Sequence, residues 1–426
     1  MTLGDIVRRH AGERPLAPAL VMGEELLTYA ELDRRANRVA NGLIAAGARP
    51  GMRIALLAKN GLEFFELLLG AMRAGVVLVP VNFRLAAPEV AYIVNDSQAE
   101  QFFVGRDYYE LATQIRGKLA TVRSMIAMDG GREGWESYRP WRDRQAPDAP
   151  PLAPAPDEIA VQMYTSGTTG HPKGAQLTHA NFMGLLPRAT GNWGDWRASD
   201  INLVCMPLFH IAGSGWGLVG LYAGACNIVL REVDPATILA AIPRHRVTKA
   251  LFVPAVILFL LQHPDREQTD FSSLELVVYG ASPIPPDLLQ RAMKAMRCDF
   301  AQVYGLTETT GAITYLPPED HRADRPERMK SCGRPHEGVE LRIVDAAGRA
   351  LPPRQIGEIV CRSAQVMKGY WNLPQATAAS VRDGWFHTGD AGYLDEDGYL
   401  YIYDRVKDMI VSGGENVYPA EVENAL

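Results

Sequence analysis

One stretch of this chain constrains its fold more than any other: an apolar run that ends in glycines and hydroxyl residues. The run Ile159–Tyr164 predicts a buried strand, and the sequence from Tyr164 to Gly174 reads YTSGTTGHPKG. Glycines let successive backbone N–H groups face one concavity, hydroxyl groups add donors, and a lysine adds positive charge. A strand that leads into such a loop predicts that the loop holds a polyphosphate.

The alternative for this stretch is a simple polar turn, because glycine, serine and threonine gather in turns anyway. The stretch also differs from the phosphate loop of NTPases, which needs Gly-Lys followed by Ser or Thr. Here Lys173 comes before Gly174, and Ala175 follows. The length and order of the whole stretch still favour a phosphate-binding loop of another kind.

Composition bounds the class of protein. The chain has 426 residues, of which 47% are hydrophobic and 22% charged, as in a globular enzyme with a sizeable core. Its formal net charge of −6 makes nucleic acid an unexpected partner. The five cysteines form no CxxC pair, which predicts reduced thiols in a cytoplasmic protein, and the N-terminus has no signal-peptide core.

The segment from Ile201 to Leu230 contains no charged residue and is long enough to cross a membrane. Pro207 and His210 interrupt it, however, and Ala225–Leu230 has the character of a strand. We therefore predict a buried strand, loop, helix and strand here, and no membrane span.

Strand-like and helical segments alternate through most of the chain. Thr28 and Glu31 have capping-box spacing ahead of an apolar helical stripe, and strand-like Arg53–Ala58 follows. Alternation of this kind predicts βαβ units and a mainly parallel sheet. A stretch rich in proline and charge, 129–157, predicts a connector, and from Ser331 short alternating runs with Asp397-Gly398 predict antiparallel hairpins.

The expected fold is therefore α/β, with two packed α/β subdomains and a small antiparallel β-barrel. We place these at about 1–157, 158–330 (with the phosphate loop) and 331–404, together a large N-terminal domain, 1–404. No short-period repeat is visible.

Several motifs recur in the order found in one superfamily. Beyond the loop these are PLFHIAG, YGAS, QVYGLTE, WFHTGD and DRVKDMIVSGGEN. Together with the loop they closely resemble the adenylate-forming acyl-CoA synthetases, a superfamily that also includes adenylation domains and luciferases. The resemblance covers most of the chain.

The resemblance implies roles for individual residues. The family's β- and γ-phosphates are held by a loop, its adenine by an aromatic and a strand end, and its ribose by an acid and an arginine. Mg²⁺ lies on a glutamate. By position the nucleotide residues are Thr165, Ser166, Gly167, Thr168, Thr169, Gly170, Lys173, Gly280, Ala281, Ser282, Tyr304, Gly305, Thr307, Asp390 and Arg405, with Glu308 for the metal.

The implied catalytic residues are Lys173, Thr165, Glu308, His210 and Thr307. His210 would lie between the nucleotide and the acid, although a lone histidine in an apolar stretch is more often a core residue. The implied acyl pocket comprises His210, Ile211, Gly213, Gly215, Trp216, Gly280 and Gly305.

The resemblance also implies a small mobile α+β C-terminal domain, which begins here as 405–426. Lys407 matches the hinge, and Gly413 and Gly414 match the lining of a coenzyme A tunnel. The chain ends at Leu426, without the lysine that the family carries further on. We therefore expect a truncated chain with impaired turnover.

The predicted function is that of an acid–thiol ligase, an AMP-forming acyl-CoA synthetase. It would use ATP, Mg²⁺ and coenzyme A to form an acyl-adenylate and then a thioester. The uncharged acyl pocket favours a fatty or aromatic acid, because a charged tail would be left unpaired there. Two alternatives stay open: an enzyme that loads a carrier-protein pantetheine, and a nucleotide-binding module without activity. The sequence leaves the exact acid, the pathway and the oligomeric state open, with a homodimer as one candidate state.

Overall fold

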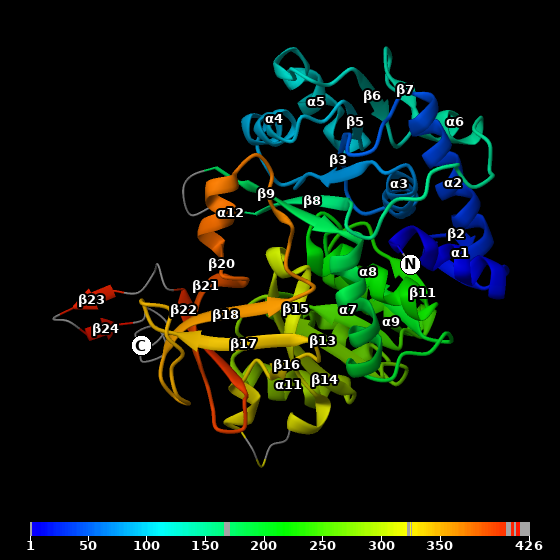
Figure 1. Cartoon of the computed structure of the whole chain (residues 1–426). Helices are drawn as coiled ribbons and strands as arrows, with labels where there is room; N and C mark the ends of the chain where they lie inside the picture. The colour runs from blue at the N-terminus through cyan, green and yellow to red at the C-terminus, as the bar shows by residue number, and fades with distance from the viewer. Residues whose placement is uncertain are drawn as a thin grey trace.

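The computed structural model describes residues 2–165, 171–321, 324, 326–405, 410–412 and 415–417. Three β-sheets carry the architecture, with a further two-stranded pair at 410–417. In Figure 1 the first sheet, which has eight strands, lies above the second sheet, which has nine. The third sheet, which is antiparallel and has five strands, lies at the lower left. The helices are α1 Leu3–Glu13, α2 Tyr29–Ala45, α3 Leu62–Arg73, α4 Ala87–Asp96, α5 Tyr109–Ile115, α6 Tyr138–Asp143, α7 His179–Asn192, α8 Ile211–Ala223, α9 Pro235–His245, α10 Pro254–Gln262, α11 Pro286–Met296 and α12 Pro374–Ser380.

The upper sheet has eight strands, and most of them run parallel. Their order is β19 (Gly369–Tyr370), β9 (Lys173–Thr178), β8 (Ile159–Thr165), β4 (Val77–Pro80), β3 (Arg53–Leu57), β5 (Gln101–Val104), β6 (Ser124–Ala127) and β7 (Glu136–Ser137). The inner strands β3, β4 and β5 are almost continuously buried, as expected where helices cover both faces of a parallel sheet.

The lower sheet has nine strands with a parallel centre. Their order is β16 (Arg334–Pro335), β15 (Gly311–Leu316), β14 (Asp299–Leu306), β13 (Leu276–Gly280), β12 (Lys249–Phe252), β10 (Ile201–Val204), β11 (Cys226–Val229), β1 (Pro18–Met22) and β2 (Glu25–Thr28). In the region predicted as strand, loop, helix and strand, the structure has β10, α8 and β11. No helix among the described residues is long and apolar enough to span a membrane.

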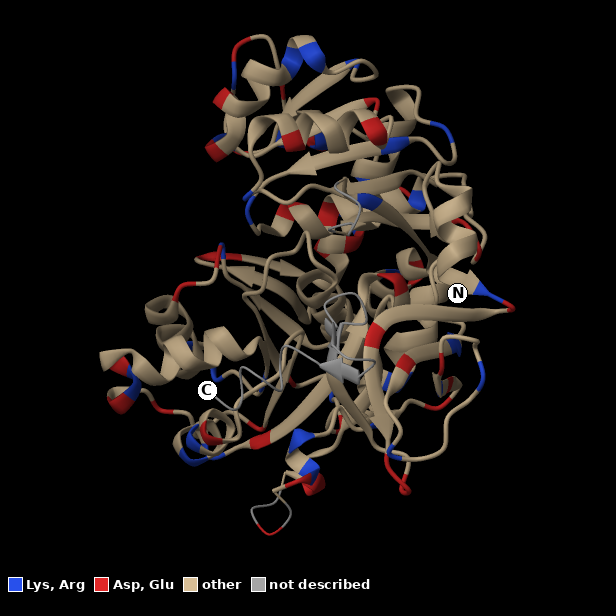
Figure 2. Cartoon of the chain, turned by 90° about the vertical axis from the view of Figure 1, so that its left-hand side faces the viewer, with Lys and Arg blue, Asp and Glu red and all other residues tan. Residues whose placement is uncertain are grey.

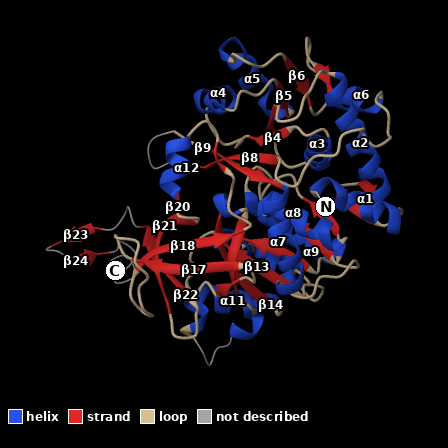
Figure 3. Ribbon diagram, in the orientation of Figure 1, coloured by secondary structure: helices blue, strands red, loops and turns tan. Residues whose placement is uncertain are grey.

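The third sheet is antiparallel and confirms the change of texture after Ser331. It contains β17 (Val339–Val344), β18 (Gly357–Ser363), β20 (Val381–Arg382), β21 (Trp385–Leu394) and β22 (Leu400–Arg405). The predicted hairpin joins β21 to β22, with Gly398 at φ +79°. Figure 3 shows these strands gathered beside the two helix-covered sheets, and Figure 2 shows acidic and basic residues interspersed over the elements that it faces. The remaining strands, β23 (Ile410–Ser412) and β24 (Glu415–Val417), pair with each other.

The helix caps follow the sequence signals. Thr28 is the N-cap of α2, and its hydroxyl accepts a 3.2 Å hydrogen bond from the backbone N–H of Glu31. Leu32, Val39 and Leu43 then lie on the fully buried face of α2. The helix packs closely on α3, so the predicted amphipathic stripe is confirmed as a core contact.

The boundary at 157 does not separate the two sheets. Strands β8 and β9, assigned by sequence to the second subdomain, join the first sheet, because β8 pairs with β4. Conversely, β1 and β2 from the N-terminus join the second sheet through β11. Local periodicity predicts each strand but carries no information about its distant partner, and here two hairpins cross the expected boundary.

Part of the predicted connector is also structured. Within 129–157, α6 packs Tyr138 and Arg142 against Glu66 of α3, a residue with no exposed surface. The Glu66 carboxylate accepts hydrogen bonds from the Tyr138 hydroxyl at 3.0 Å, from Arg142 at 2.6 Å and from Arg35 at 3.0 Å. A buried carboxylate needs such partners, so α6 is part of the core of the first subdomain.

Candidate active site

The two strands that flank the predicted phosphate loop form an antiparallel hairpin. Thr165 at the end of β8 faces Lys173 at the start of β9, and Tyr164 faces Gly174. The loop residues between them, Ser166, Gly167, Thr168, Thr169 and Gly170, lie outside the described residues. The hairpin register therefore places a hydroxyl and an ammonium group on opposite sides of the loop's entrance.

The base of this hairpin is fixed by side chains that the sequence did not single out. The Tyr164 hydroxyl donates a 2.5 Å hydrogen bond to Asp96 at the end of α4. On the other strand the backbone N–H of Trp371 donates to the Gly174 carbonyl at 2.8 Å, and the Trp371 indole donates to the Asp96 carbonyl. Asp96 and Trp371, which contact each other, thus hold Tyr164 of β8 and Gly174 of β9 on the two sides of the loop.

Glu308 lies on the short 3₁₀ turn η4 (Thr307–Thr309) that follows β14. Its side chain is only 8% exposed, and its Oε1 accepts hydrogen bonds from the Thr165 hydroxyl at 3.2 Å and from the Tyr370 hydroxyl at 2.8 Å. The turn after β14 of the second sheet therefore places the predicted metal carboxylate beside Thr165, at the end of β8 in the first sheet.

Tyr370 is a further residue that sequence reasoning missed. Its ring lies 4.6 Å from the Lys173 ammonium, while its hydroxyl binds Glu308. Burial, and next the Glu308 carboxylate, raise the pKa of the Tyr370 hydroxyl, which therefore stays protonated and donates. Only the pairing of β19 with β9, between segments far apart in the chain, reveals this position.

The residues present fit a magnesium ion bound together with phosphates. Both hydrogen bonds that the structure gives for the Glu308 carboxylate use Oε1. Among the described residues no three acidic, histidine or cysteine side chains gather as a self-sufficient metal cage. Mg²⁺ commonly binds one or two carboxylates and takes its other ligands from substrate phosphates and water.

Two of the residues expected around the nucleoside, Tyr304 and Asp390, contact each other. The Tyr304 hydroxyl donates a 2.7 Å hydrogen bond to Oδ2 of Asp390 on β21. Burial, followed by the charge of Asp390, raises the pKa of Tyr304 well above its ordinary value. Arg405 on β22 is the backbone partner of Asp390 in the sheet, so the end of the WFHTGD motif lies beside Asp404 and Arg405, the first two residues of DRVKD.

The YGAS motif ends β13 beside β14. Gly280 pairs with Val303, and a side chain at Gly280 would place Cβ 2.3 Å from the Val303 carbonyl oxygen. Ala281 adopts φ +68°, a left-handed conformation rare for alanine, and Ser282 is exposed. The turn leaves the sheet at the carboxyl end of a parallel strand, where open α/β sheets bind ligands.

The remaining phosphate and acyl candidates are dispersed over three elements, β14, η4 and the start of α8. Thr307 is the first residue of η4 and is half-buried. Gly305 lies so close to β15 that a Cβ would be 1.9 Å from the Gly311 carbonyl oxygen. His210 is the exposed N-cap residue of α8, and Ile211 follows it, half-buried. The predicted hinge at Lys407 and the tunnel glycines Gly413 and Gly414 lie outside the described residues.

Two predicted acyl-pocket residues also make close packing contacts, and their place in the acyl pocket stays a prediction. Trp216 is 2% exposed, donates its indole N–H to the Leu203 carbonyl at 3.0 Å and packs against Trp196. At Gly213 a Cβ would lie 2.3 Å from the Pro207 carbonyl oxygen, so glycine is needed for the turn before α8. Gly215 differs, because a Cβ there would meet only Ile211 at 3.6 Å.

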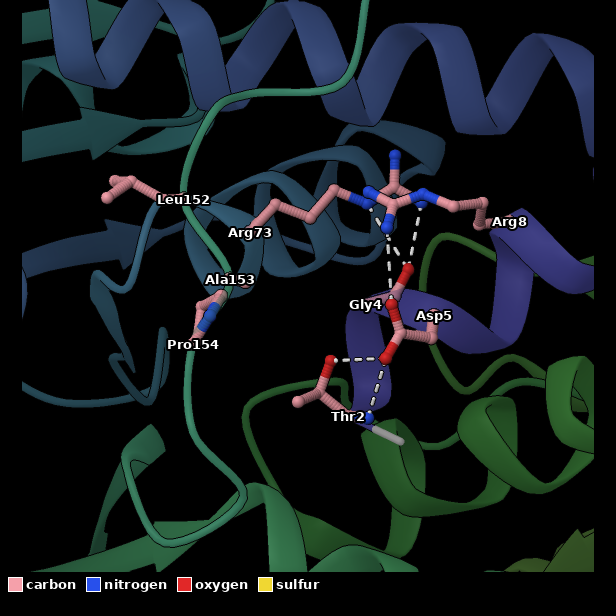
Figure 4. Close-up of a pocket in the computed structure, with 8 residues that line it drawn as sticks. All are labelled: Thr2, Gly4, Asp5, Arg8, Arg73, Leu152, Ala153 and Pro154. Carbon is pink, nitrogen blue, oxygen red and sulfur yellow. Dashed lines mark hydrogen bonds and ion pairs between the residues drawn. The ribbon is translucent and has the colours of Figure 1, made fainter.

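Two surface pockets lie away from this cluster. Figure 4 shows the smaller one, of 80 Å³, between α1 and residues 152–154. Its buried Arg73 is saturated by hydrogen bonds to Gly4, Asp33 and Asn37 and offers little to a ligand. The larger, open pocket of 720 Å³ lies between η3 (Pro264–Gln268) and α11.

Comparison with known proteins identifies the family. The sequence model described as "AMP-binding enzyme" matches residues 7–371. A fatty acid–[acyl-carrier-protein] ligase, ScoC, of Streptomyces coeruleorubidus is 39% identical over 429 residues, covering 100% of this chain and 81% of the relative. A feruloyl-CoA synthase of an Amycolatopsis species is 40% identical over 427 residues, covering 100% and 82%.

A solved structure has the same fold. The anthranilate CoA ligase AuaEII in complex with anthranoyl-AMP superposes with a TM-score of 0.93 at 29% sequence identity, covering 99% of this chain and 81% of that one. The α/β fold with its antiparallel third sheet and the motif order agree with these matches. The chain belongs to the AMP-binding enzyme family.

Proposed function

We propose that this chain is an ATP-dependent carboxylic acid:CoA ligase that forms AMP. One observation carries the proposal: the loop threonine and lysine of one sheet meet the Glu308 carboxylate of the other around a single tyrosine. A hydroxyl, an ammonium and a carboxylate so arranged suit a magnesium–triphosphate complex, in which negative charge must be neutralised before the groups can react.

The acid carboxylate would attack the α-phosphorus of ATP. An oxygen–phosphorus bond forms to the acid while the bond to pyrophosphate breaks, which yields an acyl-adenylate. Lys173, Thr165 and the loop residues 166–170 hold the departing phosphates, and Thr307 contacts the α-phosphate. Mg²⁺ on Glu308 would supply charge neutralisation at the phosphates. The attacking acid is already ionised at neutral pH, so the step needs no general base.

The nucleoside would lie along the ends of β13 and β14. Tyr304, Gly305 and the turn Gly280–Ser282 line the adenine, and Asp390 with Arg405 binds the ribose hydroxyls. The Tyr304–Asp390 hydrogen bond supports this assignment, since it holds the two side chains beside each other.

The acid would enter beside His210 and α8. The first turn of α8, residues 211–215, carries no charged side chain. A fatty or aromatic acid therefore suits this pocket better than an amino acid or a dicarboxylic acid. The feruloyl-CoA and fatty acid relatives act on acids of these two kinds.

The thiol acceptor has two candidates. Coenzyme A is the first, by analogy with the feruloyl-CoA synthase. Because a 39% identical relative is named as an acyl-carrier-protein ligase, the pantetheine thiol of a carrier protein is the second. Four assignments remain predictions: Lys407 as hinge, Gly413 and Gly414 as tunnel lining, a mobile C-terminal domain from residue 405, and a cytoplasmic location. The oligomeric state stays open.

The test is an AMP-release assay with ATP, Mg²⁺ and a panel of fatty and aromatic acids. The proposal expects AMP and pyrophosphate, in amounts that depend on the acid. Stimulation by coenzyme A or by a holo carrier protein decides the acceptor. Release of ADP and phosphate in place of AMP and pyrophosphate would contradict the proposal.

A further inference from the structure

Tyr370 stands between the two oppositely charged groups of the candidate site. The Lys173 ammonium lies 4.6 Å from the centre of its ring, and the Glu308 carboxylate accepts its hydroxyl at 2.8 Å. Tyr370 is 8% exposed, as is Glu308. Both charged residues are described, and the structure gives no direct ion pair between them.

The position of Tyr370 is fixed by backbone contacts on both sides. β19 pairs with β9, so that Tyr370 faces Ala175, two residues after Lys173. Its own N–H donates to the Thr377 hydroxyl at 2.9 Å. On the other side, the Met367 N–H donates to the Glu308 carbonyl at 2.7 Å. The strap 367–371 therefore holds the tyrosine ring relative to both charges.

Separation of these charges matters for a site that must take up both a metal and a polyphosphate. A direct, largely buried Lys173–Glu308 pair would satisfy each group with the other, and nucleotide binding would first have to break it. A tyrosine can hold both groups without neutralising either, because its ring face attracts an ammonium and its hydroxyl donates to a carboxylate.

We propose that Tyr370 is a positioning residue with two separable roles: its hydroxyl orients the Glu308 carboxylate for Mg²⁺, and its ring keeps Lys173 from pairing with Glu308. With Oε1 held by Tyr370 and Thr165, Oε2 is the oxygen left for the metal. This inference rests on the proposed use of ATP.

The test uses three single variants of the 426-residue chain. Tyr370→Phe removes the hydroxyl and keeps the ring, whereas Tyr370→Leu removes both. Tyr399→Phe is the matched control. Tyr399 is 7% exposed, donates its hydroxyl to Asp320 at 2.6 Å and has Arg328 over its ring at 3.6 Å, outside the candidate site.

Calorimetric titration with ATP, without any acid, separates the two roles. Each protein is titrated once with EDTA and once with excess Mg²⁺. For Tyr370→Phe we expect the ATP affinity in EDTA to stay within twofold of wild type. The increase in ATP affinity on adding Mg²⁺ should be about tenfold smaller than in wild type, which is the size expected for the loss of one hydrogen bond to a charged group. Tyr399→Phe should match the wild type in both titrations.

For Tyr370→Leu we expect the Mg²⁺ effect to fall and ATP affinity in EDTA to fall as well, about tenfold, because Lys173 now pairs with Glu308. The double variant Tyr370→Leu/Glu308→Gln removes the competing carboxylate. It should regain ATP affinity in EDTA to within about threefold of wild type, a rescue that general unfolding would not give.

Equal losses with and without Mg²⁺ in Tyr370→Phe would overturn the role of the hydroxyl. Unchanged ATP affinity in EDTA for Tyr370→Leu, or no recovery in the double variant, would overturn the role of the ring. The wild-type titration is read first: if wild-type protein does not bind ATP at all, the proposed function fails, and that result is distinct from any difference among the variants.

Discussion

The hydroxyl of Tyr304 donates a 2.7 Å hydrogen bond to Oδ2 of Asp390. Tyr304 lies near the carboxyl end of β14 in the nine-stranded sheet, and Asp390 lies on β21 of the antiparallel sheet. The bond therefore joins two sheets at the place proposed for the nucleoside. It orients the Asp390 carboxylate before any ligand arrives.

We predict that Asp390→Asn weakens AMP binding about tenfold, since a carboxylate that accepts from two ribose hydroxyls is replaced by a neutral amide. The measurement is calorimetry with AMP and with 2′,3′-dideoxy-AMP. Wild type and variant should bind the dideoxy nucleotide alike. A tenfold loss that persists with the dideoxy compound would remove Asp390 from the ribose.

Glu308→Gln should cripple acyl-adenylate formation by about 10²–10³, the loss typical of one charge-stabilising group. Binding of the acid itself should change little. Adenylate trapped with hydroxylamine at saturating Mg²⁺ gives the rate. Glu340→Gln is the control, because Glu340 is exposed and forms a surface ion pair with Arg362 at 2.8 Å. Near-normal turnover of Glu308→Gln would exclude Glu308 as the metal carboxylate.

The glycines at the start of α8 should differ sharply. Gly213→Ala places Cβ 2.3 Å from the Pro207 carbonyl oxygen, so we expect a loss of about 1–3 kcal/mol in the free energy of unfolding. Gly215→Ala has room and should be neutral or slightly stabilising in urea unfolding.

A single substitution Gly215→Leu in the wild-type chain should shift the preference toward shorter acids and leave ATP binding intact. The measurement is AMP release across acids of increasing chain length. If Gly215→Leu folds and its chain-length profile matches the wild type, Gly215 does not face the acid.

Stability should fall as the pH drops from about 6.5 toward 4. Burial lowers the pKa of His179 from 6.5 to about 4, and its side chain is 1% exposed. The unfolded chain therefore takes up this proton at a higher pH than the folded chain. The stability present above pH 6.5 is lost until the folded pKa is reached.

His179→Leu should reduce the loss of unfolding free energy between pH 7 and pH 5 by about 2 kcal/mol. Urea unfolding at both pH values measures it, with His263→Gln as the control at a partly exposed histidine. An identical pH dependence in wild type and His179→Leu would contradict the prediction.

The sequence predicted local features well because they depend on neighbours in the chain. Thr28 and Glu31 predicted the start of α2, and the strand-like run Arg53–Ala58 forms β3 over Arg53–Leu57. Asp397-Gly398 predicted the β21–β22 hairpin for the same reason, since a turn of this kind needs a residue at positive φ.

Relationships between distant segments were not predictable in the same way. Nothing near Tyr370 indicates that β19 adds to the edge of β9, and the strand pairing that places its ring beside Lys173 is set by tertiary packing. Trp216 was assigned to the acid pocket by the family resemblance, and that role stays a prediction. No local pattern indicates the contacts of its indole, which is buried where α8 turns that face toward Leu203 and Trp196.

In the proposed active site a nucleotide site and an acid site adjoin, so that one ligand can fill both. Calorimetric titration with an acyl-sulfamoyl adenosine, a stable mimic of an acyl-adenylate, tests this without turnover. The mimic should bind at least about 10²-fold more tightly than AMP, because the acyl group and the nucleoside bind as one molecule. An affinity equal to that of AMP, for both a fatty and an aromatic acyl group, would contradict the account.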